Sequence, residues 1–384
     1  APVTSANVRL VINRLAWYRS FTEDLMTKRI AITGGAGFVG SNLAIMIARD
    51  RPDCSVIVLD NLKRRGSELT LTRLAEAGVE FKHGDVRIAT DLEQLGDIDC
   101  LLECSAETSV LAGHGESPAY LIDSNLNGAL NCLEHLRRTG GEMIFLSSSR
   151  VYSIPALLDL PLAPNGQRFD IDADASGEGW SGKGIAEDFS TSGPRSLYGT
   201  TKLAAEAFIS EYRAAYGLRA TIYRCGVLTG PWQMGKVDQG FVTLWMARHL
   251  YGGPLSYIGH GGEGTQVRDV LHVADLYDAI APSLDGVGDL DGQNFNLGGG
   301  LDVSVSLREL TDHCKRISGN SIEIASVPET RPNDIAYYIT DASRIEIQTG
   351  WQPKRSLEET LQDIHRWLIE HRSVLEPILG GGTS

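Results

Sequence analysis

The sequence predicts an α/β fold in which a parallel sheet is covered by helices on both faces, and two patterns support this. Short apolar runs alternate along the chain with segments of helical periodicity, as in successive strand–helix units. The runs are apolar throughout rather than at every second residue, which is typical of strands buried on both faces. The predicted strands are Lys28–Thr33, Ser55–Leu59, Cys100–Cys104, Met143–Leu146 and Ala220–Tyr223, and the clearest helices are Gly40–Arg49, Ala119–Arg138 and Leu197–Tyr216.

Two segments interrupt this alternation. Residues 153–195 are rich in Pro, Gly, Asp and Ser and show no sustained period, so we expect a long loop, of the kind that is usually functional or mobile in a compact protein. Past residue 230 the alternation becomes less regular, which predicts a smaller α+β part ending in the helix Leu357–Glu370. Residues 1–26 have no continuous apolar core and do not resemble a secretory signal, and we assign them no function.

Composition argues against several classes of protein. A formal net charge of −14 over 384 residues argues against a nucleic-acid partner. No apolar run approaches the roughly 18–20 residues that span a bilayer, so we expect no membrane association. The six cysteines have no zinc or disulfide spacing, which predicts buried thiols in a reducing cytoplasm and no metal site. Because the chain is acidic, a phosphorylated ligand would need a few basic side chains gathered at its site.

A glycine motif, Thr33-Gly34-Gly35-Ala36-Gly37-Phe38-Val39-Gly40, lies between the first predicted strand and a helix. Glycines there allow a tight turn and a close approach of the backbone to a pyrophosphate. Asp60 follows about 20 residues later, where a carboxylate accepts hydrogen bonds from a ribose and repels a 2′-phosphate. The motif predicts a Rossmann-like sheet that binds NAD, although the basic neighbours Lys63, Arg64 and Arg65 leave NADP open. The predicted cofactor-binding residues of this region are Gly34, Gly37, Phe38, Val39, Gly40 and Asp60.

Tyr198 and Lys202 form a second motif, because i and i+4 positions share one face of a helix. An ammonium next to a tyrosine stabilises the phenolate, which then accepts a proton from a substrate hydroxyl at neutral pH. Ser147, Ser148 and Ser149 follow the strand Met143–Leu146, at the carboxyl edge of the sheet where ligands bind. The three segments together predict redox chemistry on a hydroxyl-bearing substrate.

These motifs divide the chain into three parts. We expect an N-terminal extension at residues 1–26 and an NAD-binding Rossmann domain at 27–224, with the loop 153–195 near its active site. Residues 225–384 would form mainly a substrate-binding domain, with segments that return to the Rossmann part.

In their order, the motifs resemble those of the extended short-chain dehydrogenase/reductase family of NAD-dependent nucleotide-sugar epimerases and dehydratases. The resemblance covers Met26 to about residue 372. Further matches are Asp60-Asn61-Leu62, His83-Gly84-Asp85-Val86-Arg87, Ser105-Ala106, Asn125 in an N-x-x-G segment, Arg268-Asp269-Val270-Leu271-His272-Val273, Asn294-Phe295-Asn296-Leu297-Gly298 and Gly350-Trp351-Gln352-Pro353.

The resemblance implies a role for each matching position. Tyr198 would be the catalytic base and acid, Lys202 would bind the nicotinamide ribose and tune the tyrosine, and Ser148 would hydrogen-bond the reacting oxygen. Further cofactor contacts would come from Asn61, Asp85, Val86, Ser105, Ala106 and Asn125. Arg268 and Arg331 would contact the substrate diphosphate, and the other substrate-binding residues would be Ser149, Arg150 and Gln239.

Departures from the family pattern narrow the chemistry. In the 4,6-dehydratases the two positions after the catalytic hydroxyl carry Asp and Glu, which eliminate water. Here they are Ser149 and Arg150, so dehydration is not supported. Val227 replaces an asparagine expected to contact the nucleotide sugar, and Glu103 stands where a histidine is common on the fourth strand.

Within the family, the chain resembles the branch that epimerises C2 of CDP-hexoses of the CDP-paratose and CDP-tyvelose type. The resemblance is carried by Ser148-Ser149-Arg150-Val151-Tyr152, Glu187-Asp188-Phe189-Ser190, Asp238-Gln239-Gly240 and Gly264–His272. It implies oxidation to a transient ketone, reduction on the opposite face and tightly retained NAD. A UDP-sugar 4-epimerase, a net NAD(P)-dependent sugar dehydrogenase or reductase and a non-catalytic NAD sensor stay open. The family also implies a homodimer that pairs helices 119–138 and 197–216 between subunits.

Overall fold

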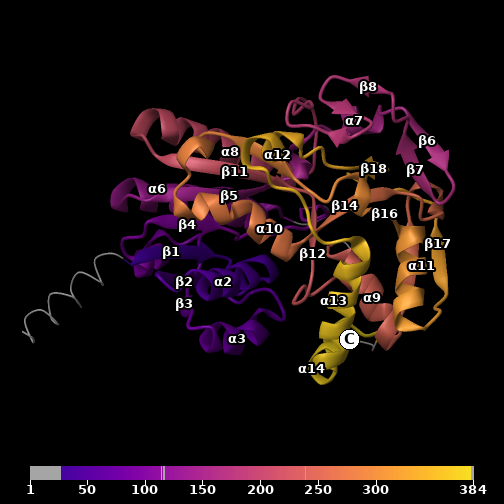
Figure 1. Cartoon of the computed structure of the whole chain (residues 1–384), viewed down its shortest axis with the longest axis horizontal. Helices are drawn as coiled ribbons and strands as arrows, with labels where there is room; N and C mark the ends of the chain where they lie inside the picture. The colour runs from indigo at the N-terminus through magenta and orange to yellow at the C-terminus, as the bar shows by residue number, and fades with distance from the viewer. Residues whose placement is uncertain (1–26, 114, 116, 238, 382–384) are drawn as a thin grey trace, which may run out of the picture.

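The computed structural model describes residues 27–113, 115, 117–237 and 239–381, so the predicted extension at 1–26 lies outside the described residues. Its centre is a seven-stranded parallel sheet in the order β15-β11-β5-β4-β1-β2-β3 (Figure 1). The strands are β1 (Lys28–Thr33), β2 (Cys54–Asp60), β3 (Glu80–His83), β4 (Cys100–Glu103), β5 (Glu142–Ser148), β11 (Arg219–Cys225) and β15 (Asn294–Leu297). Strand order reverses between β1 and β4, which makes this a doubly wound, Rossmann-like sheet. The predicted α/β fold class is confirmed.

Helices cover both faces of this sheet because alternate strand residues point to opposite sides. Ile30 and Ile32 of β1 belong to the core on one side, and Ala31 between them belongs to the core on the other. The first side carries α2 (Phe38–Asp50), α3 (Leu71–Glu76), α10 (Val273–Ile280) and α12 (Ser343–Thr349). The second side carries α4 (Ala89–Leu92), α5 (Ala119–Ile122), α6 (Gly128–Thr139) and α8 (Leu197–Tyr216).

The prediction of one continuous helix at 119–138 is wrong in one detail. A π-helical turn at Asp123–Asn127 separates α5 from α6. Gly128 opens α6 close to the loop after β3, since a Cβ there would lie 2.7 Å from a methyl carbon of Val86. The pattern of apolar residues does not reveal the extra residue that a π turn inserts, and such turns often mark functional sites.

Residues 153–195 are not the irregular loop that we expected. They contain α7 (Ile154–Leu158), a hairpin of β6 (Leu162–Asn165) with β7 (Arg168–Ile171), and the short strands β8 (Ser176–Gly177), β9 (Trp180–Ser181) and β10 (Gly184–Ile185). Leu157, Ile171 and Ile185 are buried in a small core shared with Tyr337 and Ile339. Strands of two to four residues are too short to show a period, so the sequence pattern missed them.

The later part of the chain forms a second, mixed α+β layer. Its main sheet contains β12 (Val227–Thr229), β14 (Val267–His272), β16 (Ser304–Ser306) and β18 (Tyr337–Tyr338), and β13 (Leu255–Ile258) pairs separately with β17 (Ile324–Val327). Its helices are α9 (Phe241–Tyr251), α11 (Leu307–Ser318), α13 (Leu357–Glu370) and α14 (Arg372–Leu379). The bounds of α13 match the predicted helix, and a Ser356–Glu359 capping box fixes its start. That helix was expected to end the structure, but the short α14 follows it.

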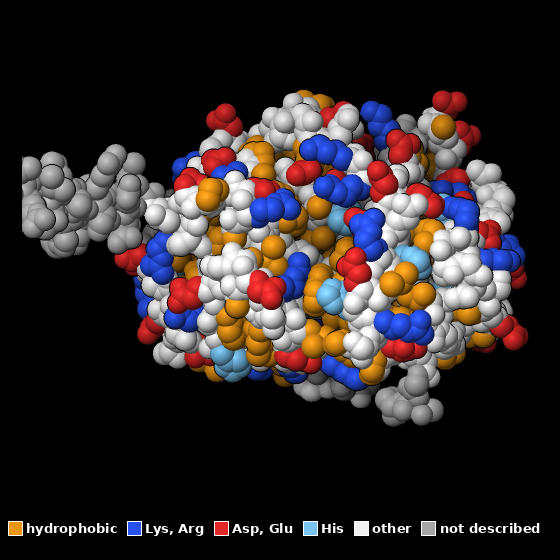
Figure 2. All heavy atoms as spheres, turned by 60° about the horizontal axis from the view of Figure 1, so that its bottom comes forward, with side chains coloured by type: hydrophobic (Ala, Val, Ile, Leu, Met, Phe, Trp, Pro, Cys, Tyr) orange, Lys and Arg blue, Asp and Glu red, His pale blue; other side chains and the backbone are white. Residues whose placement is uncertain are grey.

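Segments of this later part return to the first sheet. β15 adds to its edge by pairing with β11. The helices α10 and α12 pack on one face of the sheet (Figure 1). On the face drawn in Figure 2, lysines and arginines are interspersed with carboxylates and apolar groups rather than gathered into one basic patch. No helix in the described part of the chain has the length and apolarity required to span a membrane.

Candidate active site

The glycine motif forms the turn between β1 and α2, and its backbone could not be built with larger residues. Gly34 has a φ of +64°, and a Cβ there would lie 2.8 Å from the carbonyl oxygen of Cys104. A Cβ on Gly40 would lie 2.3 Å from the carbonyl oxygen of Gly34. Gly37 is the N-cap of α2, and no side chain caps that helix end. The positive end of the helix is therefore available to a phosphate group.

A cavity of about 440 Å³ opens in front of this turn, and we call it the glycine-loop cavity. All but one of the predicted cofactor-binding residues outside the Tyr–Lys motif line it. They are Gly34, Gly37, Phe38, Val39, Gly40, Asp60, Asn61, Asp85, Val86, Ser105 and Ala106. The exception is Asn125. Its side chain accepts from the Glu107 backbone N–H at 2.7 Å and donates to the Glu107 carbonyl at 2.9 Å, so its amide holds the loop after β4 instead.

Two hydroxyl groups in this cavity lack a partner. The Thr108 and Ser124 hydroxyl oxygens are buried, line the glycine-loop cavity and make no hydrogen bond within the described residues. Buried polar groups are costly unless a partner satisfies them, so these hydroxyls point to a polar ligand. Neither residue belongs to a motif, and sequence analysis missed both. Together with the glycine turn and Asp60, they fit a dinucleotide.

Asp60 lies where a ribose-binding carboxylate was expected, at the end of β2. It accepts hydrogen bonds from the backbone N–H groups of Ala36 (3.1 Å) and Leu62 (2.7 Å), and burial raises its pKa. Two of its basic neighbours are engaged elsewhere. The Lys63 ammonium lies 2.9 Å from the centroid of the Tyr120 ring, and Arg64 donates to the Met234 carbonyl at 3.0 Å. These contacts favour NAD over a cofactor that carries a 2′-phosphate.

The Tyr–Lys motif begins α8, directly after the N-cap Ser196. Tyr198 and Lys202 are both buried and line a second cavity of about 390 Å³, which we call the tyrosine cavity. The Tyr198 hydroxyl makes no hydrogen bond to any other described residue, so it is available to a ligand. Gly199 lets α8 approach the strand end closely, because a Cβ there would lie 2.0 Å from the Arg150 carbonyl oxygen.

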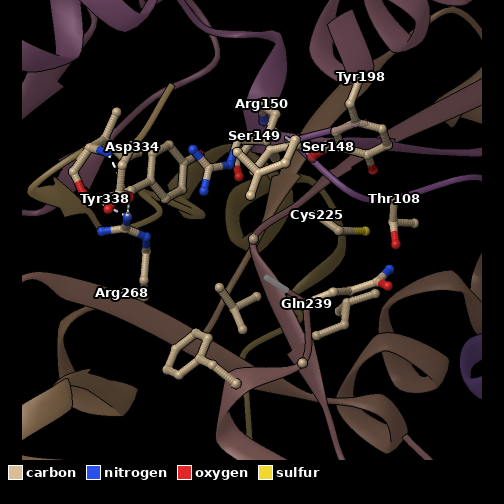
Figure 3. Close-up of a pocket in the computed structure, with 18 of the residues that line it drawn as sticks. Thr108, Ser148, Ser149, Arg150, Tyr198, Cys225, Gln239, Arg268, Asp334 and Tyr338 are labelled. Carbon is tan, nitrogen blue, oxygen red and sulfur yellow. Dashed lines mark hydrogen bonds and ion pairs between the residues drawn. The ribbon is translucent and has the colours of Figure 1, made fainter. Parts of the chain in front are cut away.

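The tyrosine cavity brings together all eight residues predicted for catalysis and substrate binding. They are Ser148, Ser149, Arg150, Tyr198, Lys202, Gln239, Arg268 and Arg331. Ser148 is the last residue of β5, and its hydroxyl oxygen accepts from the Arg150 backbone N–H at 3.1 Å. Figure 3 shows the Tyr198 ring beside Ser148 and Thr108, with Arg268 and Asp334 at the opposite end of the cavity.

Positive charge dominates that opposite end. Arg268 pairs with Asp334 at 3.1 Å and donates to the Ile335 carbonyl at 2.6 Å, while Arg150 donates to the Asn333 carbonyl at 3.3 Å. Burial alone would raise the pKa of Asp334, but His260 and the two arginines lower it to about 2. Asp334 is the one carboxylate among the described residues that line the cavity, whereas three arginines line it. This local excess of cations in an acidic protein suits a diphosphate.

Lys202 has a charged partner that no motif indicated. Its Nζ lies 3.4 Å from Oε2 of Glu103, the last residue of β4, and both side chains are almost fully buried. Burial acts to lower the pKa of Lys202, but the Glu103 carboxylate and then the Tyr198 side chain raise it, and the net direction is upward. The ammonium therefore stays charged beside the tyrosine, as the acid–base role requires.

The two cavities adjoin each other. Phe38, Val39, Cys104, Ala106, Thr108, Gln233 and Gln239 line both of them. A dinucleotide that extends from the glycine turn would thus reach the cavity that contains Tyr198. In open α/β sheets, ligands generally bind outside the carboxyl ends of the strands, near the point where the strand order reverses, and the two cavities lie at such a position here.

The fold and the two joined cavities define an extended short-chain dehydrogenase/reductase. The chain belongs to the NAD dependent epimerase/dehydratase family, whose model matches residues 30–298. NAD is accordingly its cofactor, and the residues of the glycine-loop cavity fit it.

Individual relatives differ in reaction. The chain is 28% identical to the CDP-paratose 2-epimerase of Salmonella typhi over 88% of this chain and 98% of that protein. It is 29% identical to the dTDP-glucose 4,6-dehydratase of Mycolicibacterium smegmatis over 91% of this chain and 96% of the relative. The crystal structure of Thermus thermophilus UDP-glucose 4-epimerase in complex with NAD aligns with a TM-score of 0.68 at 26% identity, covering 88% of this chain and 98% of the other.

Proposed function

We propose that the protein is a nucleotide-sugar epimerase that oxidises a sugar hydroxyl to a transient ketone and reduces it again on the opposite face. The observation that carries this proposal is that the two cavities adjoin and share lining residues, with Ser148, Tyr198 and Lys202 lining the second and arginines at its far end. The specific reaction we propose is C2 epimerisation of a CDP-hexose, of the CDP-paratose or CDP-tyvelose type.

The site residues divide the chemistry among them. NAD, when bound, supplies a hydride acceptor that becomes the donor in the return step. Tyr198 takes the proton of the reacting hydroxyl and gives it back when the ketone is reduced, because the Lys202 ammonium stabilises its phenolate. Ser148 donates a hydrogen bond to the reacting oxygen, and Arg268 and Arg331 bind the diphosphate.

The residues beside Ser148 favour epimerisation over dehydration. Elimination of water needs a base and an acid next to the ketone, and carboxyl groups serve that purpose well. Ser149 and Arg150 occupy those positions here. A guanidinium is effectively always protonated, so Arg150 does not act as a base. Both residues line the tyrosine cavity and would contact the sugar instead.

The choice of C2 and of a CDP carrier is supported by the relative from Salmonella typhi and by the Ser-Ser-Arg-Val-Tyr segment. A UDP-sugar 4-epimerase is the alternative, supported by the structural likeness to the Thermus thermophilus enzyme. The two functions share Tyr198, Lys202 and Ser148 and differ in which sugar carbon faces the cofactor. A net NAD(P)-dependent sugar dehydrogenase or reductase would use the same residues but would exchange its cofactor.

One experiment separates these functions. The purified protein is assayed for retained NAD and then incubated with CDP-, UDP-, GDP- and dTDP-hexoses. We expect a product of unchanged mass with altered sugar proton couplings from a CDP-hexose, without net formation of NADH. A substrate deuterated at C2 should react more slowly, and its product should keep the label. A substrate deuterated at C4 should react at the same rate as the unlabelled substrate. A C4 isotope effect would instead identify a 4-epimerase, and net NADH would identify a dehydrogenase.

We also infer a homodimer that pairs α5–α6 and α8 with their copies. Phe208 and Tyr216 on α8 are 42% and 59% exposed, and a partner helix packed on α8 would cover them. Sedimentation should give a dimer for the native protein and a monomer for Phe208→Glu. A monomeric native protein at assay concentration would contradict this inference.

A further inference from the structure

We propose that Glu103 is a positioning residue that keeps the Lys202 ammonium charged and holds it next to Tyr198. The structural part of this proposal concerns only the state of Lys202. Its catalytic consequence rests on the proposed function, in which Lys202 tunes the tyrosine.

Glu103 and Lys202 form a closed ion pair between the sheet and α8. Glu103 is 1% exposed and Lys202 is 2% exposed, and Oε2 and Nζ lie 3.4 Å apart. The other carboxylate oxygen of Glu103 accepts a hydrogen bond from the Ser105 hydroxyl, which fixes the side chain. The Lys202 ammonium also lies 4.5 Å from the centroid of the Phe145 ring, and Phe145 is the residue of the neighbouring strand β5 that pairs with Glu103. The ammonium therefore contacts a carboxylate and a ring face that neighbouring strands of the sheet present to it.

Glu103 is the carboxylate that compensates the charge of Lys202. No other carboxylate in the described residues lies within 4.0 Å of its Nζ. A buried ammonium without a counterion loses its proton readily, because water no longer solvates the charge. A neutral Lys202 would leave the Tyr198 phenolate without its cation, and the tyrosine would ionise only at higher pH.

The remaining titratable groups around this pair do not change charge near neutral pH. Cys104 follows β4, Cys132 lies on α6 and Cys225 ends β11, and burial raises the pKa of each thiol, to about 12 for Cys225. Arg150, which faces Tyr198 from the end of β5, keeps its charge as a guanidinium. These groups therefore leave the charge around Lys202 and Tyr198 unchanged over that range.

The first test does not need a substrate. The protein contains eight lysines, so an NMR spectrum of protein labelled with ¹³Cε-lysine has few signals that overlap. The signal that is lost in Lys202→Met belongs to Lys202. Glu103→Gln should lower the titration midpoint of Lys202 by about 3 pH units or more, because the fully buried ammonium then has no counterion. The matched control is Glu206→Gln. Glu206 lies on α8 like Lys202, and its buried carboxylate pairs with Arg224 instead, so this variant should leave the Lys202 midpoint unchanged. An unchanged or raised midpoint in Glu103→Gln overturns the proposal.

The second test uses turnover. In Glu103→Gln the acid limb of kcat against pH should move to higher pH by about 1 unit, and Glu103→Asp should move it less, because a carboxylate is still present. A limb that stays in place or moves to lower pH overturns the proposal. If Glu103→Gln does not fold, Glu103→Asp replaces it in both tests. Its Lys202 midpoint should then be lower than in the native protein, and its acid limb of kcat should lie at higher pH. If the native protein converts no nucleotide sugar, the proposed function fails, while the NMR titration still decides the role of Glu103.

Discussion

At the scale of single residues, the availability of the Tyr198 hydroxyl leads to the most direct prediction. Because no described residue engages it, replacing it should remove proton transfer without disturbing the packing of α8. Tyr198→Phe should lower kcat by about 10²–10⁴-fold, the range typical of a positioned general base. The amount of NAD that co-purifies should stay unchanged, which serves as the control for folding. Turnover equal to that of the native protein would remove Tyr198 from the mechanism.

Asp269 gives a second residue-scale prediction, on stability. Its carboxylate is fully buried, accepts from the backbone N–H groups of Gly300 and Thr340 at 3.2 Å each, and burial raises its pKa from 3.8 to about 6. A raised pKa in the folded state means that the carboxyl stabilises the fold fully below about pH 4, and that this stabilisation is lost as the pH rises through about 6.

The Asp269→Asn variant lacks this titration. The difference in free energy of unfolding, native minus variant, should therefore fall by about 2.5 kcal/mol between pH 4 and pH 7. Denaturant unfolding at pH 4, 5, 6 and 7 measures it. A difference that is the same at all four pH values would contradict the assignment.

Residues that belong to a spaced motif could be placed from the sequence, because their geometry is local. Tyr198 and Lys202 are one helical turn apart in any helix, and the glycines of β1–α2 are fixed by one turn. Thr108 and Ser124 could not be placed, since only the packing of distant segments leaves their hydroxyls without partners. Asn125 shows the opposite case: its position matches a family pattern, but its amide bonds to the Glu107 backbone.

At the scale of elements, the β1–α2 turn separates packing from ligand binding. A Cβ on Gly40 would collide with the Gly34 carbonyl at 2.3 Å, whereas a Cβ on Gly37 would meet only that oxygen, at 3.1 Å. Gly40→Ala should therefore lower the thermal unfolding midpoint. Gly37→Ala should keep the fold but weaken NAD binding by about 10-fold or more, because its methyl group enters the space of the pyrophosphate. Calorimetry of NAD binding and thermal unfolding of both variants check this. Equal NAD affinity in Gly37→Ala would contradict it.

The elements also show which parts of a fold have a readable pattern. β2 and β5 are seven-residue buried strands, and their apolar runs identified them to within two residues at each end. The strands of 153–195 have two to four residues and take their stability from contacts with β18 and the segment after it, which local sequence does not encode. The π turn before α6 was missed for a related reason, since one inserted residue barely changes the helical period.

At the scale of the whole molecule, the active site exists because the chain after β11 leaves the first sheet and then returns to it. The segment between β12 and α9 carries Gln233 and Gln239, which line both cavities. Asn42 of α2 donates to the Pro231 carbonyl at 3.0 Å, and Arg64 donates to Gln239 and to the Met234 carbonyl. The second layer therefore covers part of the cofactor site through contacts with the first.

This arrangement predicts that Arg64 controls the retention of NAD. The proposed epimerase regains its hydride in every cycle and would benefit from a cofactor that does not leave. Gln233, Met234 and Gln239 line the glycine-loop cavity, and Arg64 fixes this side of it by donating to Gln239 and to the Met234 carbonyl. Hydrogen bonds from a charged donor contribute about 1.5–3 kcal/mol each, so Arg64→Ala should release NAD at least about 10-fold faster. The matched control is Arg65→Ala, which removes a neighbouring arginine that lines the same cavity. Fluorescence of NADH during displacement by excess NAD measures both rates. Equal release rates for Arg64→Ala and the native protein would show that this segment does not hold the cofactor in place.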